Sequence, residues 1–255
     1  MKKILNRVPE ITIPFWIIKV LATTVGETAA DFLSVTLNFG LSVTSYVMSG
    51  VLLIVLLNQF RLKRYVPVSY WIVVIVMSIT GTLITDRLVD DLGVSLMTTT
   101  IFFSVVLLVV FIFWYVNEKT LAMHSINTAK RELFYWVAIL FTFALGTATG
   151  DLLAEALKLG YTQSALVFGS LIAVITLSYY YLRINAVLAF WLAYILTRPL
   201  GASVGDLLSQ PTTSGGLGWG TVNTSMLFLS LITSLIIYLS FKHKKRVSLP
   251  IDPQN

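Results

Sequence analysis

The sequence contains no cysteine, only two histidines and little charge. The absence of cysteine excludes a disulfide framework and a thiolate metal site. His124 and His243 both fall in segments that we expect outside the membrane, which argues against a buried zinc or copper site. Charged residues make up 12% of the 255 residues and hydrophobic residues 56%, whereas a soluble domain carries about 25% charged residues. The composition therefore indicates an integral membrane protein.

Sequence motifs of soluble catalysis are also missing. We find no glycine-rich phosphate loop after a strand, no His-Glu-x-x-His motif and no Ser/His/Asp set with a suitable histidine. Asp151 and Asp206 each follow a glycine, which only partly matches the setting of an intramembrane aspartyl hydrolase. We therefore do not expect an enzyme, and we rank such a hydrolase well below a binding or transport function.

Eight apolar stretches account for most of the chain, and each is close to the roughly 20 residues that span a bilayer. The predicted spans are residues 12–37, 41–60, 68–91, 94–116, 133–158, 161–182, 186–208 and 221–241. Every second span ends near a residue that stops a helix, namely Gly40, Gly93, Gly160 or Pro211. The sequence thus predicts an all-α integral membrane fold with about eight transmembrane helices.

One pattern occurs four times along the chain. An aromatic residue and a tryptophan are followed by nine residues, a glycine, four residues and an aspartate. The tryptophans are Trp16, Trp71, Trp136 and Trp191; the glycines are Gly26, Gly81, Gly146 and Gly201; the aspartates are Asp31, Asp86, Asp151 and Asp206. Successive copies lie 55, 65 and 55 residues apart, so the two halves of the chain repeat each other.

These copies divide a single membrane domain, residues 1–255, into four tandem helix-hairpin repeats. We place the repeats at residues 10–65, 66–120, 130–184 and 185–242, and the halves at 1–120 and 121–255. Each hairpin enters and leaves on the same side, so the repeats are predicted to be parallel, with pseudo-symmetry about the membrane normal. Because Trp16 is in register with the other tryptophans, we expect the first apolar segment to be retained rather than cleaved as a signal peptide.

The basic residues predict the orientation. Fourteen of the 18 lysines and arginines fall on one side of the predicted spans: Lys2, Lys3, Arg7, Arg61, Lys63, Arg64, Lys119, Lys130, Arg131, Arg183, Lys242, Lys244, Lys245 and Arg246. The positive-inside rule makes this side cytoplasmic, with both termini in the cytoplasm. The net charge of +6 is then a topology signal, and we expect no nucleic-acid partner.

The acidic residues carry the functional signal. Eight of the twelve fall in the repeat motifs: Glu27, Asp31, Asp86, Asp90, Asp91, Asp151, Glu155 and Asp206. A carboxylate that faces lipid at mid-depth costs about 2.5–3.5 kcal/mol on insertion scales, so we expect these groups to face an interior crevice. In three repeats two carboxylates lie four residues apart, on one helix face. Nearby hydroxyls would add oxygen ligands at Thr28, Thr82, Thr85, Thr147, Thr149 and Ser203.

Such a set of oxygen ligands suits H⁺, Na⁺, Mg²⁺, Ca²⁺ or Mn²⁺ better than soft metals. We predict Asp31, Asp86, Asp151 and Asp206 as principal ligands, with Glu27, Asp90 and Glu155 as further ligands or proton carriers. The alternative is a set of structural ion pairs with the four basic residues in or near the spans, Lys19, Arg87, Lys158 and Arg198. Four basic residues cannot neutralise eight acids, and this excess favours a cation site.

The repeat also resembles a known family. Gly26–Asp31, Gly146–Glu155 and Arg198–Asp206 are similar to a bacterial membrane-protein family of four tandem two-helix repeats, each with a characteristic tryptophan. The resemblance covers nearly the whole chain. It implies the repeat architecture and a multi-pass protein of the bacterial plasma (inner) membrane, and it supplies no settled substrate.

From the residues we expect a transporter or channel for a hard cation, either divalent, such as Mn²⁺ or Mg²⁺, or proton-coupled. No resident cofactor is expected beyond a bound divalent cation, and the partners are membrane lipid and the transported ion. The oligomeric state stays open, with a homodimer as one candidate. The alternative function is a non-transporting lipid-binding or assembly factor with structural carboxylates. The two functions differ in whether the aspartates meet at a wet cavity.

Overall fold

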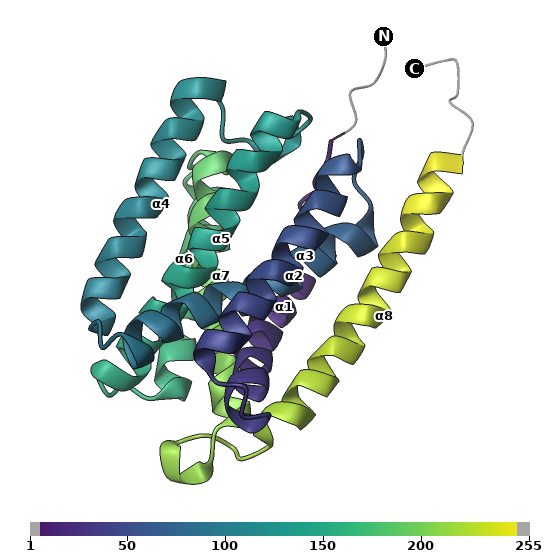
Figure 1. Ribbon diagram of the computed structural model, residues 1–255. Coiled ribbons are helices and arrows are strands. Elements are labelled where there is room, and N and C mark those ends of the chain that lie inside the picture. Colours follow the sequence, from purple (N-terminus) through teal and green to yellow (C-terminus); the bar gives the residue numbers. More distant parts are fainter. Residues whose placement is uncertain (1–5, 249–255) are drawn as a thin grey trace, which may run out of the picture.

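The computed structural model describes residues 6–248, with side chains described up to residue 242, and this part of the chain is all-helical (Figure 1). Its eight long helices are α1 (Ile13–Asp31), α2 (Leu41–Arg61), α3 (Pro67–Asp86), α4 (Leu96–Glu118), α5 (Ala129–Asp151), α6 (Tyr161–Tyr181), α7 (Ala186–Ser209) and α8 (Gly220–Ser248). Short 3-10 turns lie at Met123–Ser125 and Thr212–Ser214. The predicted spans agree with these helices to within a few residues, except that α8 continues past residue 241.

Three of the helices end in a π-helical segment that the sequence did not predict. These segments are η1 (Phe32–Thr36), η2 (Arg87–Asp91) and η4 (Leu152–Ala156), and each begins directly after the repeat aspartate. Gly40, Gly93 and Gly160 follow with φ of 74°, 67° and 77°, a conformation that glycine adopts without steric cost. The helix stops predicted at these glycines are confirmed, while π-helical turns are rare and often occur at functional sites.

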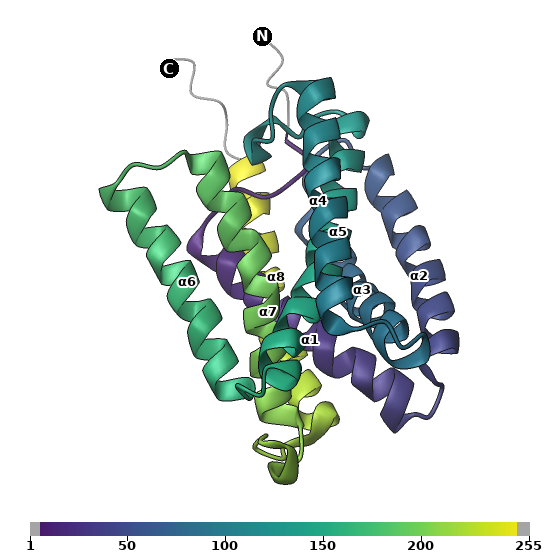
Figure 2. The same ribbon diagram turned by 90° about the vertical axis from the view of Figure 1, so that its left-hand side faces the viewer.

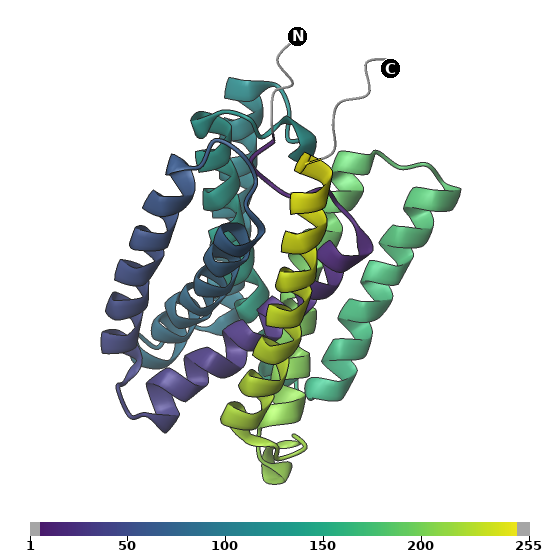
Figure 3. The ribbon, with the colours of Figure 1, turned by 90° about the vertical axis from the view of Figure 1, so that its right-hand side faces the viewer.

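The odd-numbered helices form a closed inner ring. α1 contacts α3 and α7, and α5 contacts the same two helices from the other side. The even-numbered helices cover this ring from outside: α2 packs on α3, α4 on α5, α6 on α7 and α8 on α1 (Figures 2 and 3). The outer helix of each repeat therefore covers the inner helix of the next repeat, and the last repeat covers the first.

Close contacts at the four repeat glycines hold the inner ring together. A Cβ atom added at Gly26 would meet Ser78, and one at Gly81 would meet Phe143. In the same way, Gly146 lies against Arg198. Gly201 lies against Thr23, and this contact between the last repeat and the first closes the ring. In each case the glycine lies against the residue three positions before the next repeat's glycine. The ring therefore has fourfold pseudo-symmetry, and these glycines allow the inner helices to pack closely.

The bundle has the surface of a membrane protein. Seven of the eight described helices are long and apolar enough to cross a bilayer. In the outer helices α2, α4, α6 and α8 only 11–22% of the most apolar stretch is buried, against 61–67% in α3, α5 and α7. The remaining helix, α1, occupies the equivalent place in the ring, and it is less apolar because it carries Lys19, Glu27 and Asp31. The eight helices thus form one multi-pass bundle.

The basic loops lie together at one end of the bundle, where α1 begins and α8 ends (Figure 1). We call this the basic end and the opposite one the acidic end. The described basic residues there include Arg7, Arg61, Lys63, Arg64, Lys119, Lys130, Arg131 and Arg183. Lys2 and Lys3 lie outside the described residues, as do the side chains of His243, Lys244, Lys245 and Arg246.

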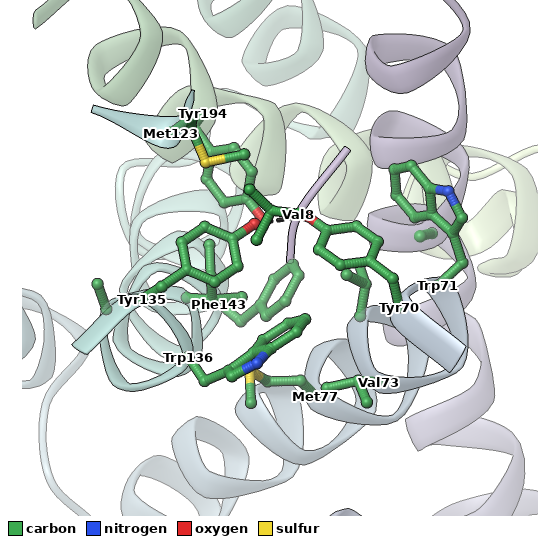
Figure 4. Close-up of a cluster of buried hydrophobic side chains, with 14 of the residues drawn as sticks. Val8, Tyr70, Trp71, Val73, Met77, Met123, Tyr135, Trp136, Phe143 and Tyr194 are labelled. Carbon is green, nitrogen blue, oxygen red and sulfur yellow. Dashed lines mark hydrogen bonds between the residues drawn. The ribbon is translucent and has the colours of Figure 1, made fainter. Parts of the chain in front are cut away.

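Aromatic side chains close the ring at the basic end. In each repeat the tryptophan packs edge-on against the aromatic residue before it, with ring centroids 5.0–5.3 Å apart. The hydroxyl groups of Tyr70 and Tyr135 form a hydrogen bond between the neighbouring inner helices α3 and α5 (Figure 4). Val8, from the segment before α1, is buried in this cluster. The repeat tryptophans therefore serve as packing residues at this end of the bundle.

Candidate functional site

Residues four apart on each inner helix form successive layers along the ring. Residues four apart share a helix face, so they point to the same side of the helix in successive layers. Each of the four inner helices contributes one residue to a layer, and each layer therefore contains one residue from each repeat. The layer at the repeat glycine minus three contains Thr23, Ser78, Phe143 and Arg198, and the layer after the glycine contains Glu27, Thr82, Thr147 and Ala202. The four repeat aspartates form the next layer toward the acidic end. The inner ring is thus a stack of four-residue layers. Within one layer the four repeats occupy equivalent positions but carry different residue types.

A cavity of about 170 Å³ opens at the acidic end of the ring. All seven carboxylates predicted as ligands line it: Glu27, Asp31, Asp86, Asp90, Asp151, Glu155 and Asp206. Gln210, which stands in the fourth repeat where the others have Val35, Asp90 and Glu155, lines it as well. The expectation that the carboxylates face an interior crevice rather than lipid therefore agrees with their positions.

The carboxylates become less exposed with depth in this acidic cavity. Asp90 and Glu155 are exposed at its mouth, and Asp31, Asp86 and Asp151 are half-buried. Asp206 and Glu27 are the least exposed, with 7% and 6% of their surface exposed. Solvent exposure therefore falls from the mouth of the cavity toward the layer that contains Glu27.

Three of the seven carboxylates come close enough together to share one ion. Glu27, Asp151 and Asp206 each offer one oxygen, and these oxygens lie within 4.8 Å of one another. This trio includes Glu27, which we ranked behind the four aspartates from the sequence. Asp31 accepts a hydrogen bond from Gln210 Nε2 at 3.2 Å, and Asp86 lies on the cavity wall. The predicted ring of four equivalent aspartates is thus only pseudo-symmetric.

Arg198 forms the floor of the acidic cavity. Its fully buried guanidinium donates to Glu27 Oε2 at 2.9 Å and to the backbone oxygen of Thr23 at 2.6 Å. It also donates to Thr147 Oγ1 at 2.8 Å and to Thr82 Oγ1. One side chain of α7 therefore reaches α1, α3 and α5. Its ion pair is formed with Glu27 of α1 and not with Asp206, which lies two turns along α7 itself.

Lys19 lies one layer further toward the basic end. Its side chain is fully buried, and its Nζ atom lies 4.3 Å from the ring centroid of Phe143 and 4.2 Å from that of Tyr194. The amine has no hydrogen-bond or ion-pair partner among the described residues. Two basic side chains, Arg198 and Lys19, thus follow each other between the acidic cavity and the aromatic cluster.

The remaining basic residues do not neutralise the carboxylates. Arg87 donates to the hydroxyl of Tyr46 at 2.9 Å, outside the ring. Lys158 forms no ion pair within the described part of the chain, and Arg198 is the only one of the four bases that pairs with a motif carboxylate there. Asp86, Asp151 and Asp206 have neither an ion-pair nor a hydrogen-bond partner among described residues. Structural ion pairs therefore account for one of the seven cavity carboxylates.

Only two of the six predicted hydroxyl ligands contact the floor of the cavity. Thr82 and Thr147 hydrogen-bond Arg198 there. Thr28 is bonded to Ser225 of α8 at 2.7 Å, and Thr85 donates to a backbone oxygen of α5 at 2.9 Å. Asp91, the eighth motif carboxylate, accepts from Ser42 at 3.1 Å and does not line the cavity. A single helix pattern could not predict these differences because they depend on how neighbouring helices are rotated.

A second buried carboxylate has a different environment. Glu132 is fully buried at the basic end, where it accepts from Arg7 at 2.6 Å, from Gln59 at 3.1 Å and from Trp136 Nε1 at 3.3 Å. This network ties the segment before α1 to α2 and α5. Glu132 thus shows what a structural carboxylate looks like in this fold, whereas Asp86, Asp151 and Asp206 have no such donors among the described residues.

The fold and the cavity together define the chain as an all-helical, multi-pass membrane protein of four tandem repeats with an acidic cavity at one end. The repeats themselves identify the family. Residues 14–65, 69–120, 134–185 and 189–245 each match the family described as Repeat of Unknown Function (DUF347), so the chain belongs to this family. The match confirms the four repeats that the tryptophan spacing predicted. Neither the curated proteins nor the solved structures contain a match to the chain.

Proposed function

We propose that this protein transports a small, hard cation through its acidic cavity, a divalent ion such as Mn²⁺ or Mg²⁺ or a proton-coupled ion. One observation carries the proposal: carboxylates from all four repeats line the same cavity without matching basic partners. Asp206 illustrates this, since it is 93% buried, lines the cavity and has no ion-pair or hydrogen-bond partner among the described residues. A carboxylate held in this way is stabilised when a cation occupies the cavity.

The spacing of the Glu27, Asp151 and Asp206 carboxylates fits a hard divalent ion. Oxygen ligands lie about 2.0–2.1 Å from Mg²⁺ and about 2.3–2.6 Å from Ca²⁺, so two oxygens on opposite sides of one ion are about 4–5 Å apart. The oxygens of Glu27, Asp151 and Asp206 lie within 4.8 Å of one another. Small side-chain movements would bring all three onto one ion. Water molecules in the cavity would complete the coordination shell.

The lining of the cavity argues for an inorganic ion rather than an organic one. Its walls consist of carboxylates, Ser34 and Gln210, with the aliphatic side chains of Val35, Leu41, Val89 and Leu96 beside them. Among the described residues no aromatic ring lines it, whereas sites for organic ammonium ions use aromatic faces. The absence of histidine and cysteine from the lining also favours hard over soft metals.

The arrangement of charges supports an orientation. The basic end would face the cytoplasm and the acidic cavity would open to the exterior, following the positive-inside rule. With the family resemblance, this gives a protein of the bacterial plasma membrane with both termini in the cytoplasm. The cavity would then receive ions from outside the cell in this conformation.

Because the floor of the cavity is closed, we also consider a second function that involves no transport. Arg198 and the aromatic cluster separate the acidic cavity from the basic end. A protein that never opened this barrier would hold a cation or assist lipid binding or assembly without transport. The two functions predict different results once the protein is placed in a sealed membrane.

A flux measurement distinguishes them. The purified protein would be reconstituted into liposomes loaded with a metal-sensitive dye, and Mn²⁺, Mg²⁺, Ca²⁺ and Na⁺ would be added outside in turn. We expect saturable uptake of at least one hard cation above protein-free liposomes. The matched control is the Asp151→Asn/Asp206→Asn variant, which keeps the shape of the trio and removes two charges. Cation binding without flux would favour the second function, and the absence of both binding and flux would overturn the transport proposal and leave the lipid-binding or assembly function.

A further inference from the structure

Arg198 breaks the symmetry of the ring at its most confined point. The equivalent positions in the other repeats hold Thr23, Ser78 and Phe143, which are neutral. Arginine stays protonated in proteins, so the floor of the acidic cavity carries a permanent positive charge. This charge lies inside the ring rather than at its surface, because the side chain is fully buried. It is therefore positioned to affect any cation that enters.

The guanidinium contacts one member of the candidate ligand trio. Its Nη2 atom lies 2.9 Å from Oε2 of Glu27, and Glu27 is one of the three carboxylates whose oxygens lie within 4.8 Å. An oxygen that accepts a charge-assisted hydrogen bond from arginine has less negative charge to offer a metal ion. Arg198 and an entering cation therefore compete for the same carboxylate.

The other contacts of Arg198 connect this competition to the packing of the ring. Through Thr23, Thr82 and Thr147 the guanidinium joins α7 to α1, α3 and α5. The Cβ and Cγ atoms of the same side chain lie directly against Gly146. Displacement of this one group would loosen the floor at all four inner helices.

We propose that Arg198 is a tethered cation that closes the floor of the acidic cavity by pairing with Glu27 and is displaced when the transported cation takes that carboxylate. This inference rests on the proposed function. It explains how a protein whose cavity is closed by an ion pair can still transport a cation. The cation that binds to Glu27 displaces Arg198, which is the group that closes the cavity.

Removal of the competitor should strengthen binding. In Arg198→Met the long apolar side chain keeps the contact with Gly146 and loses the charge. We expect Mn²⁺ to bind this variant about tenfold or more tightly, because hydrogen bonds between charged groups contribute more than neutral ones. This increase in Mn²⁺ affinity should depend on Glu27. In a protein that already carries Glu27→Gln, the additional Arg198→Met substitution should therefore leave the Mn²⁺ affinity unchanged. Calorimetric titration of the four purified proteins with MnCl₂ measures the Mn²⁺ affinities that this double-mutant cycle compares.

A second measurement retains the native Arg198 and so does not depend on the folding of that variant. The chain has no cysteine, so Ala202→Cys introduces a single thiol into the buried layer that contains Glu27. Because Arg198 joins all four inner helices, its displacement also separates the aromatic side chains carried by those helices. We therefore expect a membrane-impermeant methanethiosulfonate reagent, added on the side of the basic end, to label this thiol about tenfold faster with saturating Mn²⁺ than without it. Thr213→Cys, in the loop at the acidic end, should label equally in both conditions when the reagent is added on that side.

The outcomes separate this inference from the proposed function. If the wild-type protein binds no hard cation, the proposed function fails. If the wild type binds Mn²⁺ but labelling of Ala202→Cys does not depend on Mn²⁺, Arg198 is a structural residue and only this inference is overturned. An unchanged Mn²⁺ affinity in a folded Arg198→Met protein would overturn it as well.

Discussion

Gly201 of α7 lies directly against the side chain of Thr23 of α1, and this contact closes the inner ring between the last repeat and the first. Three other glycine contacts of the same kind join the remaining neighbours. A chain of repeats joined head to tail would otherwise leave an open end, with its buried polar residues exposed to lipid. The closure of the ring is what encloses the acidic cavity.

The first prediction concerns this contact. A Cβ atom at position 201 would lie 2.6 Å from Cβ of Thr23 and 3.1 Å from the backbone nitrogen of Thr24. Because part of this contact is backbone, the helices would have to separate. We expect Gly201→Ala to destabilise the protein by about 1–3 kcal/mol, the usual cost of overpacking, and to lower the melting temperature in detergent.

The matched control is Gly50→Ala on the outer helix α2. No heavy atom lies within 4 Å of a Cβ added there, and alanine favours a helix over glycine by about 1 kcal/mol or less. The control protein should melt at the wild-type temperature or slightly above it. Equal melting temperatures for the two variants would show that the ring tolerates wider spacing and that the glycines are not needed for closure.

The second prediction separates carboxylates that bind a cation from those that hold the fold. Asp206→Asn and Asp151→Asn keep the side-chain shape and remove charge from groups that have no ion-pair partner among the described residues. We expect cation flux to be abolished in Asp151→Asn and the apparent cation affinity to fall in Asp206→Asn. The melting temperature should change by no more than a few degrees in either variant, because no buried cation loses its partner.

Glu132→Gln also replaces a carboxylate by its amide, but at a carboxylate that we expect to be structural. Glu132 is fully buried and pairs with Arg7 at 2.6 Å, so its neutralisation leaves a poorly compensated cation. Breaking a buried ion pair typically costs about 3–5 kcal/mol. We expect a large drop in melting temperature, measured with the same assay as for the aspartate variants. If the aspartate variants lost as much stability as Glu132→Gln while keeping normal flux, the cavity carboxylates would be structural.

Sequence reasoning predicted the fold well because its signals are local. The apolar runs, the helix-stopping glycines and the tryptophan spacing each depend on a few neighbouring residues. The site was predicted as a set of residues, and all seven predicted carboxylates line one cavity. The close grouping of Glu27 with Asp151 and Asp206 was not predicted, because it depends on how α1, α5 and α7 are rotated against one another.

The partner of Arg198 could not be predicted for the same reason. On α7 itself the nearest carboxylate along the helix face is Asp206, and the observed partner is Glu27 on α1. The glycine contacts bring α7 close enough to α1 for the side chain to cross. The three π-helical segments were also not predicted, since no known residue pattern marks them as clearly as glycine marks a turn.

The third prediction tests the orientation. The loop that contains Thr213 lies at the acidic end, opposite the end where α1 begins and α8 ends. Reporter proteins fused to either terminus should therefore report the cytoplasm, and a reporter inserted at Thr213 should report the exterior. A C-terminal fusion that reports the exterior would contradict the positive-inside interpretation and the count of eight crossings.

The last prediction concerns Lys19, whose amine lies between two aromatic rings without a hydrogen-bond or ion-pair partner in the described part of the chain. A cation–π contact contributes about 2 kcal/mol when desolvated, while the penalty for burying an ammonium amounts to several kcal/mol. Lys19→Met keeps the length and volume of the side chain and removes this penalty, so we expect a higher melting temperature. Lys130→Met, at a half-exposed ion pair with Glu118, should change it little. If Lys19 is retained because the path for cations needs its charge, flux in Lys19→Met should be altered even though the protein is more stable. A less stable Lys19→Met protein would instead show that the amine has a structural partner in the bundle.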